Sequence, residues 1–290
     1  MTDTDPEIST WTASDGYPIL VASWRPSSTP PRGRVVILHG VQSHQGWYQG
    51  LGRRLADAGF ESHIPDRRGS GGNTKDRGHT TSPRRLVEDV GEFLIELDSR
   101  LPDIPTAIVG ISWGGKLAIL AAGRYPQSVS ALALVCPGVQ PRVGVSFGER
   151  MRIALAYFTN RTKRFAIPLS DPALFTSNPE GQAFIRADPL GLRQATAGLL
   201  AASTLIDRSV ARAPSKVLQP ALLMLASEDR IVNNELTRRY FDRFASPDRT
   251  IIEYPGAHHT LEFEQDPSEY ATDLAGWLGE KLRKNCVGFR

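Results

Sequence analysis

Cysteine, long apolar runs and a strong excess of one charge are all missing from this sequence. Cys136 and Cys286 are the only cysteines, too few for a disulfide framework or a cysteine-based metal site, and typical of a reducing compartment. No apolar run approaches the roughly 20 residues that span a bilayer, and residues 1–9 are acidic and polar, unlike a signal peptide. The sequence therefore predicts a cytoplasmic protein with no integral membrane segment.

The charge balance and the binding motifs exclude further classes of protein. Lys and Arg number 34 against 31 Asp and Glu, and the net charge of +3 is too small to favour a nucleic-acid partner. The six histidines do not cluster with cysteines or carboxylates at metal-ligand spacing. The glycine-rich residues 69–72 lack the order of a phosphate-binding loop. We expect no metal and no cofactor.

Strand-like apolar runs alternate with helix-like periodicities over most of the chain. This alternation favours a mostly parallel, doubly wound sheet with helices on both faces, preceded by an antiparallel hairpin that turns at Asp15-Gly16. The expected strands are residues 10–13, 19–24, 34–39, 61–65, 106–111, 131–136, 221–226 and 250–254. The sequence thus predicts an α/β fold.

The alternation breaks between residues 139 and 218. This stretch has helix-like pieces at 151–158 and 192–206, linked by segments that contain prolines, and no strand-like run. We expect a helical cap inserted over the carboxyl edge of the sheet, where ligands bind in such folds. The core would then consist of residues 1–138 and 219–290, with the cap at 139–218.

The segment Gly110-Ile111-Ser112-Trp113-Gly114 matches the pattern G-x-S-x-G. It follows an expected strand and precedes an expected helix, so the sharp turn would expose the Ser112 hydroxyl above the sheet. Such a serine acts as a nucleophile only with a base to take its proton and donors to hold an oxyanion.

The chain offers candidates for both partners of this serine. A base is expected in the loop after the last strand, where His259 is our choice and its neighbour His258 the alternative. A carboxylate is expected after the strand at 221–226, where Asp229 is our choice and Glu228 the alternative.

Two backbone N–H groups are expected to form the oxyanion hole. One belongs to Trp113, directly after the nucleophile, and the other to Val41, which Gly40 brings toward the site. His39 ends a buried strand, and we expect it to have a structural role.

These motifs resemble those of the α/β-hydrolase superfamily, and most of all the monoacylglycerol lipase and lysophospholipase group. Residues 39–48 are similar to its H-G-x-x-x-H-x-G-x-Y stretch, and 66–71 with 77–79 to its D-x-x-G-x-G…R-G-H loop. Residues 110–115, 228–230 and 256–259 match its nucleophile, acid and histidine motifs. The resemblance implies a triad of Ser112, Asp229 and His259, and so favours Asp229 over Glu228 and His259 over His258.

The resemblance implies a serine hydrolase that cleaves carboxylic esters through an acyl-enzyme. Its partner would be a small ester with an apolar acyl chain, bound by Gly40 and by cap residues that include Phe147, Met151 and Leu199. Trp113 stands where the group usually has a smaller residue, which predicts short to medium acyl chains.

Two alternatives remain beside the esterase. An amidase of the proline iminopeptidase type would use acidic cap residues to hold a free amino terminus; those available are Glu149, Asp171, Glu180 and Asp188. A non-catalytic ligand-binding protein is less favoured, because this chain keeps all three triad residues.

Overall fold

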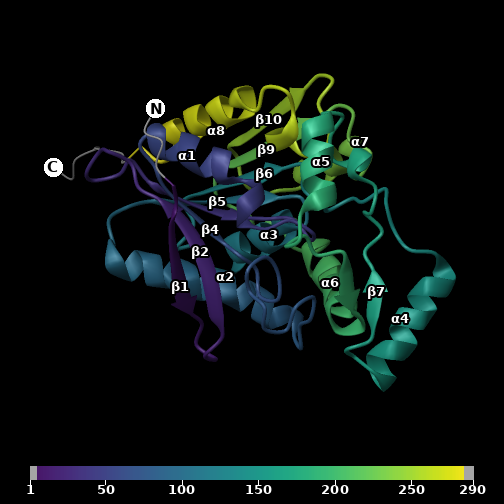
Figure 1. Ribbon diagram of the computed structural model, residues 1–290. Helices are drawn as coiled ribbons and strands as arrows, with labels where there is room; N and C mark the ends of the chain where they lie inside the picture. The colour runs from purple at the N-terminus through teal and green to yellow at the C-terminus, as the bar shows by residue number, and fades with distance from the viewer. Residues whose placement is uncertain (1–4, 284–290) are drawn as a thin grey trace.

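The computed structural model describes residues 5–283 and centres on one eight-stranded sheet (Figure 1). The strand order is β1-β2-β4-β3-β5-β6-β9-β10, and β2 runs antiparallel to both neighbours while the remaining pairs are parallel. The strands are β1 (Glu7–Thr12), β2 (Pro18–Trp24), β3 (Arg34–Leu38), β4 (Glu61–Pro65), β5 (Thr106–Ile111), β6 (Ala131–Val135), β9 (Ala221–Ala226) and β10 (Arg249–Tyr254). The predicted fold class is confirmed. Cys286 lies outside the described residues.

Helices cover both faces of this sheet, and this explains the continuous apolar runs of its central strands. Every residue of β3, β5, β6 and β9 is buried. One apolar core lies under α1 (Gln49–Asp57) and α8 (Ser268–Lys281), which run side by side above the sheet in Figure 1. The other lies under α2 (Pro83–Arg100), α3 (Gly114–Arg124) and α7 (Asn234–Phe241).

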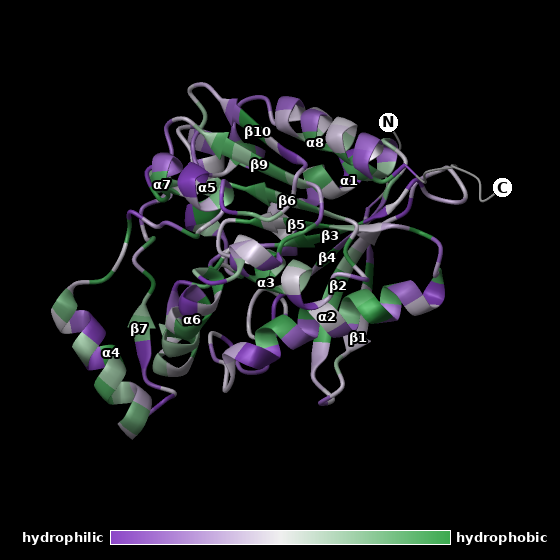
Figure 2. Ribbon diagram, turned by 180° about the vertical axis from the view of Figure 1, so that it is seen from behind, coloured by the Kyte–Doolittle hydropathy of each residue, from purple (hydrophilic) through white to green (hydrophobic). Residues whose placement is uncertain are grey.

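Residues 139–218, called the insertion from here on, contain three α-helices, each preceded by a polar capping side chain. Ser146 caps α4 (Phe147–Thr159), Asn178 caps α5 (Pro179–Ala187) and Thr196 caps α6 (Ala197–Val210). Helix α6 packs against α2 and α3 of the core, whereas α4 packs against α6 and projects away from the sheet (Figure 2).

Our expectation of no strand in the insertion is wrong. β7 (Arg164–Ala166) and β8 (Gln194–Thr196) form a small antiparallel sheet. Strands of three residues are too short to establish an alternating pattern in the sequence. β8 also runs directly into α6, which is why the sequence pattern predicted a single helix over residues 192–206. We also expected the prolines of this stretch to lie in the segments that link its helices. Three of them instead begin helices, because the fixed φ of proline suits the first helical position. They are Pro172, Pro179 and Pro214.

Within residues 5–283, no helix is both long enough and apolar enough to cross a membrane.

Candidate active site

Ser112 lies at the turn from β5 into α3, with a left-handed backbone φ of 52° that is strained for a serine. A Cβ added to Gly114 would lie 2.1 Å from the carbonyl oxygen of Leu38, and one added to Gly110 would lie 2.6 Å from the Cβ of Ala118. Only glycine allows β3, β5 and α3 to approach so closely. The G-x-S-x-G pattern therefore builds the sharp turn that holds Ser112 at the carboxyl edge of the sheet.

The Ser112 hydroxyl faces the ring of His259, which in turn contacts Asp229. The distance from Ser112 Oγ to His259 Nε2 is 2.8 Å, and from His259 Nδ1 to Asp229 Oδ2 it is 2.7 Å. Because an ionised carboxylate only accepts hydrogen bonds, the ring proton belongs on Nδ1 and Nε2 can accept the serine hydroxyl. Three loops, after β5, β9 and β10, thus contribute to one hydrogen-bonded chain.

The structure distinguishes between the neighbouring candidates in two of these loops. The His258 ring lies 3.5 Å from the Glu264 carboxylate, and Glu228 is exposed to solvent. Asp229 and His259 are buried, with exposed fractions of 4% and 2%. Asp229 and His259 are therefore the two that extend the chain from Ser112.

Backbone donors hold the Asp229 carboxylate in place. Its Oδ1 accepts the N–H groups of Ile231 and Val232, both at 2.8 Å, while Oδ2 is left for His259. The main chain therefore holds Oδ1, which keeps Oδ2 directed at His259. The bond from His259 Nδ1 to Oδ2 then sets the orientation of the ring.

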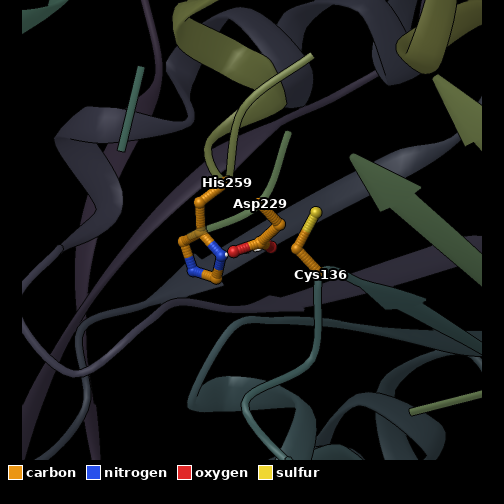
Figure 3. Close-up of side chains that lie close together, drawn as sticks. All are labelled: Cys136, Asp229 and His259. Atoms are coloured by element: carbon orange, nitrogen blue, oxygen red, sulfur yellow. Dashed lines mark hydrogen bonds and ion pairs between the residues drawn. The ribbon is translucent and has the colours of Figure 1, made fainter. Parts of the chain in front are cut away.

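Cys136 lies beside this pair (Figure 3). Its Sγ, an Asp229 oxygen and a His259 ring nitrogen lie within 4.8 Å of one another, which resembles a metal-binding group. Burial and the nearby Asp229 charge raise the pKa of the Cys136 thiol well above its usual value, so the sulfur keeps its proton. A protonated thiol is a poor metal ligand, and Asp229 and His259 already bind each other. The group therefore fits a metal ion poorly.

The backbone N–H groups of Val41 and Trp113 belong to the two segments that adjoin Ser112. Within residues 5–283, neither Val41 nor Trp113 donates a backbone hydrogen bond. A Cβ added to Gly40 would lie 3.4 Å from the Cβ of Ser112, so residues 39–46, the β3 loop, run directly beside the serine. Trp113 precedes the first turn of α3, where N–H groups point out of the helix. The arrangement suits negative charge next to Ser112.

His39 braces the β3 loop, as expected. Its Nδ1 donates to the carbonyl oxygen of Gly40 at 2.8 Å, and its Nε2 accepts the backbone N–H of Arg67 at 2.8 Å. Burial lowers the pKa of His39 well below its usual value, so the ring is neutral and both bonds can form.

The residues expected to bind substrate lie in different settings. Gly40 is beside Ser112, and Leu199 is buried on α6 in the same apolar cluster as Trp113. Phe147 and Met151 are 79% and 55% exposed on α4. The structure thus places Gly40 next to the serine, buries Leu199 and leaves Phe147 and Met151 exposed to solvent on the insertion, and their contact with substrate stays a prediction.

Several contacts around the site were not predicted from the sequence. Asp188 of the insertion accepts from Trp47 Nε1 at 2.8 Å and lies 3.2 Å from His44 Nε2, so it joins the insertion to the β3 loop. The Phe175 ring centroid lies 6.1 Å from that of His259. These partners lie far apart in sequence, and no local pattern connects them.

The family model described as serine aminopeptidase, S33, matches residues 29–266, which is most of the chain. The chain belongs to this family. The family is one of α/β-hydrolases, so this match agrees with the resemblance seen in the motifs.

Within the α/β-hydrolases, this chain resembles monoacylglycerol lipases. It is 29% identical to the monoacylglycerol lipase of Mycolicibacterium smegmatis, over 92% of this chain and 95% of that protein. It is 26% identical to the human monoglyceride lipase, over 87% of this chain and 82% of that protein. The crystal structure of the Paleococcus ferrophilus monoacylglycerol lipase superposes with a TM-score of 0.78 at 26% identity, covering 91% and 99% of the two chains.

Proposed function

We propose that this protein is a serine hydrolase that cleaves carboxylic esters through an acyl-enzyme. Ser112 Oγ attacks the ester carbonyl, and His259 Nε2 takes the hydroxyl proton and then gives it to the leaving alcohol. Asp229 holds the Nδ1 tautomer and stabilises the imidazolium. Water then attacks the acyl-enzyme by the same proton route, releasing the acid and the free serine.

The N–H groups of Val41 and Trp113 hold the oxyanion of each tetrahedral intermediate in this mechanism. Both are backbone donors on rigid segments, so they need no rearrangement when charge develops. Within residues 5–283 neither N–H donates a backbone hydrogen bond, so both are available for this role.

The observation that carries the proposal is the chain of hydrogen bonds from Ser112 Oγ through His259 to Asp229, at 2.8 and 2.7 Å. Similarity to monoacylglycerol lipases supports esters of an apolar acyl chain as the substrate. Trp113 is bulky and is held by a hydrogen bond from its Nε1 to Ser203 Oγ of α6 at 2.9 Å. We therefore propose short to medium acyl chains, with the insertion acting as the cap of a core formed by residues 1–138 and 219–290.

The alternative amidase activity would need a free carboxylate over the site to hold an amino terminus, and the family description keeps this candidate open. Asp188 is engaged by His44 and Trp47, and Asp171 and Glu180 are exposed. Glu149 is paired with Arg152. These contacts favour the esterase.

A substrate panel tests the proposal. Wild type and Ser112→Ala would be assayed with p-nitrophenyl esters of increasing acyl length, with monoacylglycerols and with aminoacyl anilides. We expect ester cleavage by the wild type alone. Anilide cleavage with no ester cleavage would favour the aminopeptidase, and ester cleavage by the Ser112→Ala variant at the wild-type rate would refute the nucleophile.

A further inference from the structure

One buried side chain contacts both residues that we propose to form the oxyanion hole. Arg67 follows β4, and its guanidinium donates from Nη1 to the carbonyl oxygen of Gly40 and from Nη2 to that of Val41, each at 3.1 Å. The same guanidinium lies over the indole ring of Trp113, 4.8 Å from its centroid.

The bond to Gly40 acts directly on the orientation of the proposed donor at Val41. The Gly40 carbonyl and the Val41 N–H belong to one planar peptide unit, which is trans and so directs the two groups in opposite directions. Anchoring the oxygen therefore fixes where the N–H points. A hydrogen bond from a cation to the oxygen also polarises the amide and makes its N–H a stronger donor.

The charge of Arg67 is not neutralised by an ion pair. Within the described chain, no carboxylate lies at ion-pair distance from its guanidinium, and its buried Nε has no hydrogen-bond partner. The adjacent Asp66 carboxylate instead accepts the backbone N–H groups of Gln45 and Gly72, both at 2.8 Å. Burial lowers the pKa of Arg67 to about 10, which leaves it positive at neutral pH.

An unpaired buried cation costs stability that a well-packed apolar side chain would not. At this position, however, the cation bonds the peptide unit that carries the Val41 N–H and lies over the side chain of Trp113, the two residues proposed to hold the oxyanion. From this geometry we infer that Arg67 is a positioning residue for ester hydrolysis, which orients and polarises the Val41 donor and packs the residue that carries the Trp113 donor. The inference rests on the proposed function.

The chain contains a matched control in the next residue. Arg68 is as buried as Arg67, with exposed fractions of 9% and 8%. Its guanidinium points elsewhere, pairing with Asp89 at 2.8 Å and lying 4.0 Å from the centroid of the Tyr17 ring. Substituting Arg68 thus disturbs a buried arginine of the same loop without touching the Gly40 and Val41 carbonyls.

The test compares Arg67→Met, Arg67→Gln, Arg67→Lys and Arg68→Met for Tm and for kcat and KM with p-nitrophenyl butyrate. Arg67→Met should lower kcat by about 10- to 100-fold, less than loss of a donor itself, with KM within about threefold and Tm within a few degrees. Arg67→Lys keeps the charge and should recover part of kcat. Arg68→Met should behave in the opposite way, with a Tm lower by about 5–10 °C and kcat within about threefold.

The outcomes separate this inference from the proposed function. If the wild type hydrolyses esters and Arg67→Met keeps its kcat, or if both Met variants lose kcat equally, the positioning role is refuted. Should Arg67→Met fail to fold, Arg67→Gln decides, and a kcat within twofold of wild type would refute the role. A wild type with no esterase activity would overturn the proposed function, and the inference with it.

Discussion

Replacing Asp229 by Asn should abolish most activity without changing the shape of the site, and the structure gives the reason. Asp229 Oδ1 accepts two backbone N–H groups, so the single oxygen of Asn must take that place. The amide nitrogen then faces His259 Nδ1, which must give up its proton to accept a hydrogen bond. The proton moves to Nε2, and the ring now directs an N–H at Ser112 Oγ instead of a lone pair.

A base in the wrong tautomer cannot take the serine proton. We expect kcat/KM for p-nitrophenyl butyrate to fall by about 10³- to 10⁴-fold, which corresponds to about 4–5.5 kcal/mol in the activation barrier. The matched control is Glu228→Gln, which changes an exposed neighbour and should stay within about tenfold. An Asp229→Asn variant with more than a tenth of wild-type activity would refute the tautomer argument, and a crippled Glu228→Gln would mean that the acid is misassigned.

Further predictions concern the other residues of the site. Ser112→Ala should lose ester hydrolysis by several orders of magnitude with an unchanged circular dichroism spectrum, and a fluorophosphonate should no longer label the chain. His259→Ala should be similarly impaired, whereas His258→Ala should stay within about tenfold; a reversed pair would shift the assigned base by one residue. Trp113→Ala should move the kcat/KM optimum toward longer acyl esters, and an unchanged profile would show that the indole does not limit the pocket. Burial raises the pKa of the Glu262 carboxyl from 4.5 to about 7. Between these two pH values the folded chain keeps a proton on Glu262 that the unfolded chain releases. Stability should therefore fall as pH rises from about 4.5 to 7, and Glu262→Gln should flatten that part of a Tm-against-pH curve.

The sheet could be predicted because its central strands are buried on both faces. Such strands read as unbroken apolar runs, and the helices between them keep a clear period, so the order and type of elements followed from local pattern. The turn at Ser112 was predictable for the same reason, because its glycines, at 110 and 114, are required by close backbone approach.

The insertion could be predicted only in outline. Its two short strands form because β7 and β8 meet across some thirty residues, a pairing that three-residue segments cannot signal in sequence. Phe147 and Met151 also show the limit of hydrophobicity as a guide to burial, since both are large apolar side chains and both lie exposed on α4. Whether a helical apolar face points inward depends on how its helix docks, and no local pattern encodes that.

The two sides of the site are held by different means. The serine side is fixed by backbone strain and close packing, which glycines reveal in the sequence. The β3 loop is fixed by buried polar side chains: His39 at its own first position, and Arg67 and Asp188 from remote segments. A loop of small and polar residues has little apolar surface to pack, so its peptide planes are set by hydrogen bonds, most of which come from outside it. This is why the proposed nucleophile could be predicted from five consecutive residues, while the side chains that bond the peptide of the Val41 N–H became visible only in the folded chain.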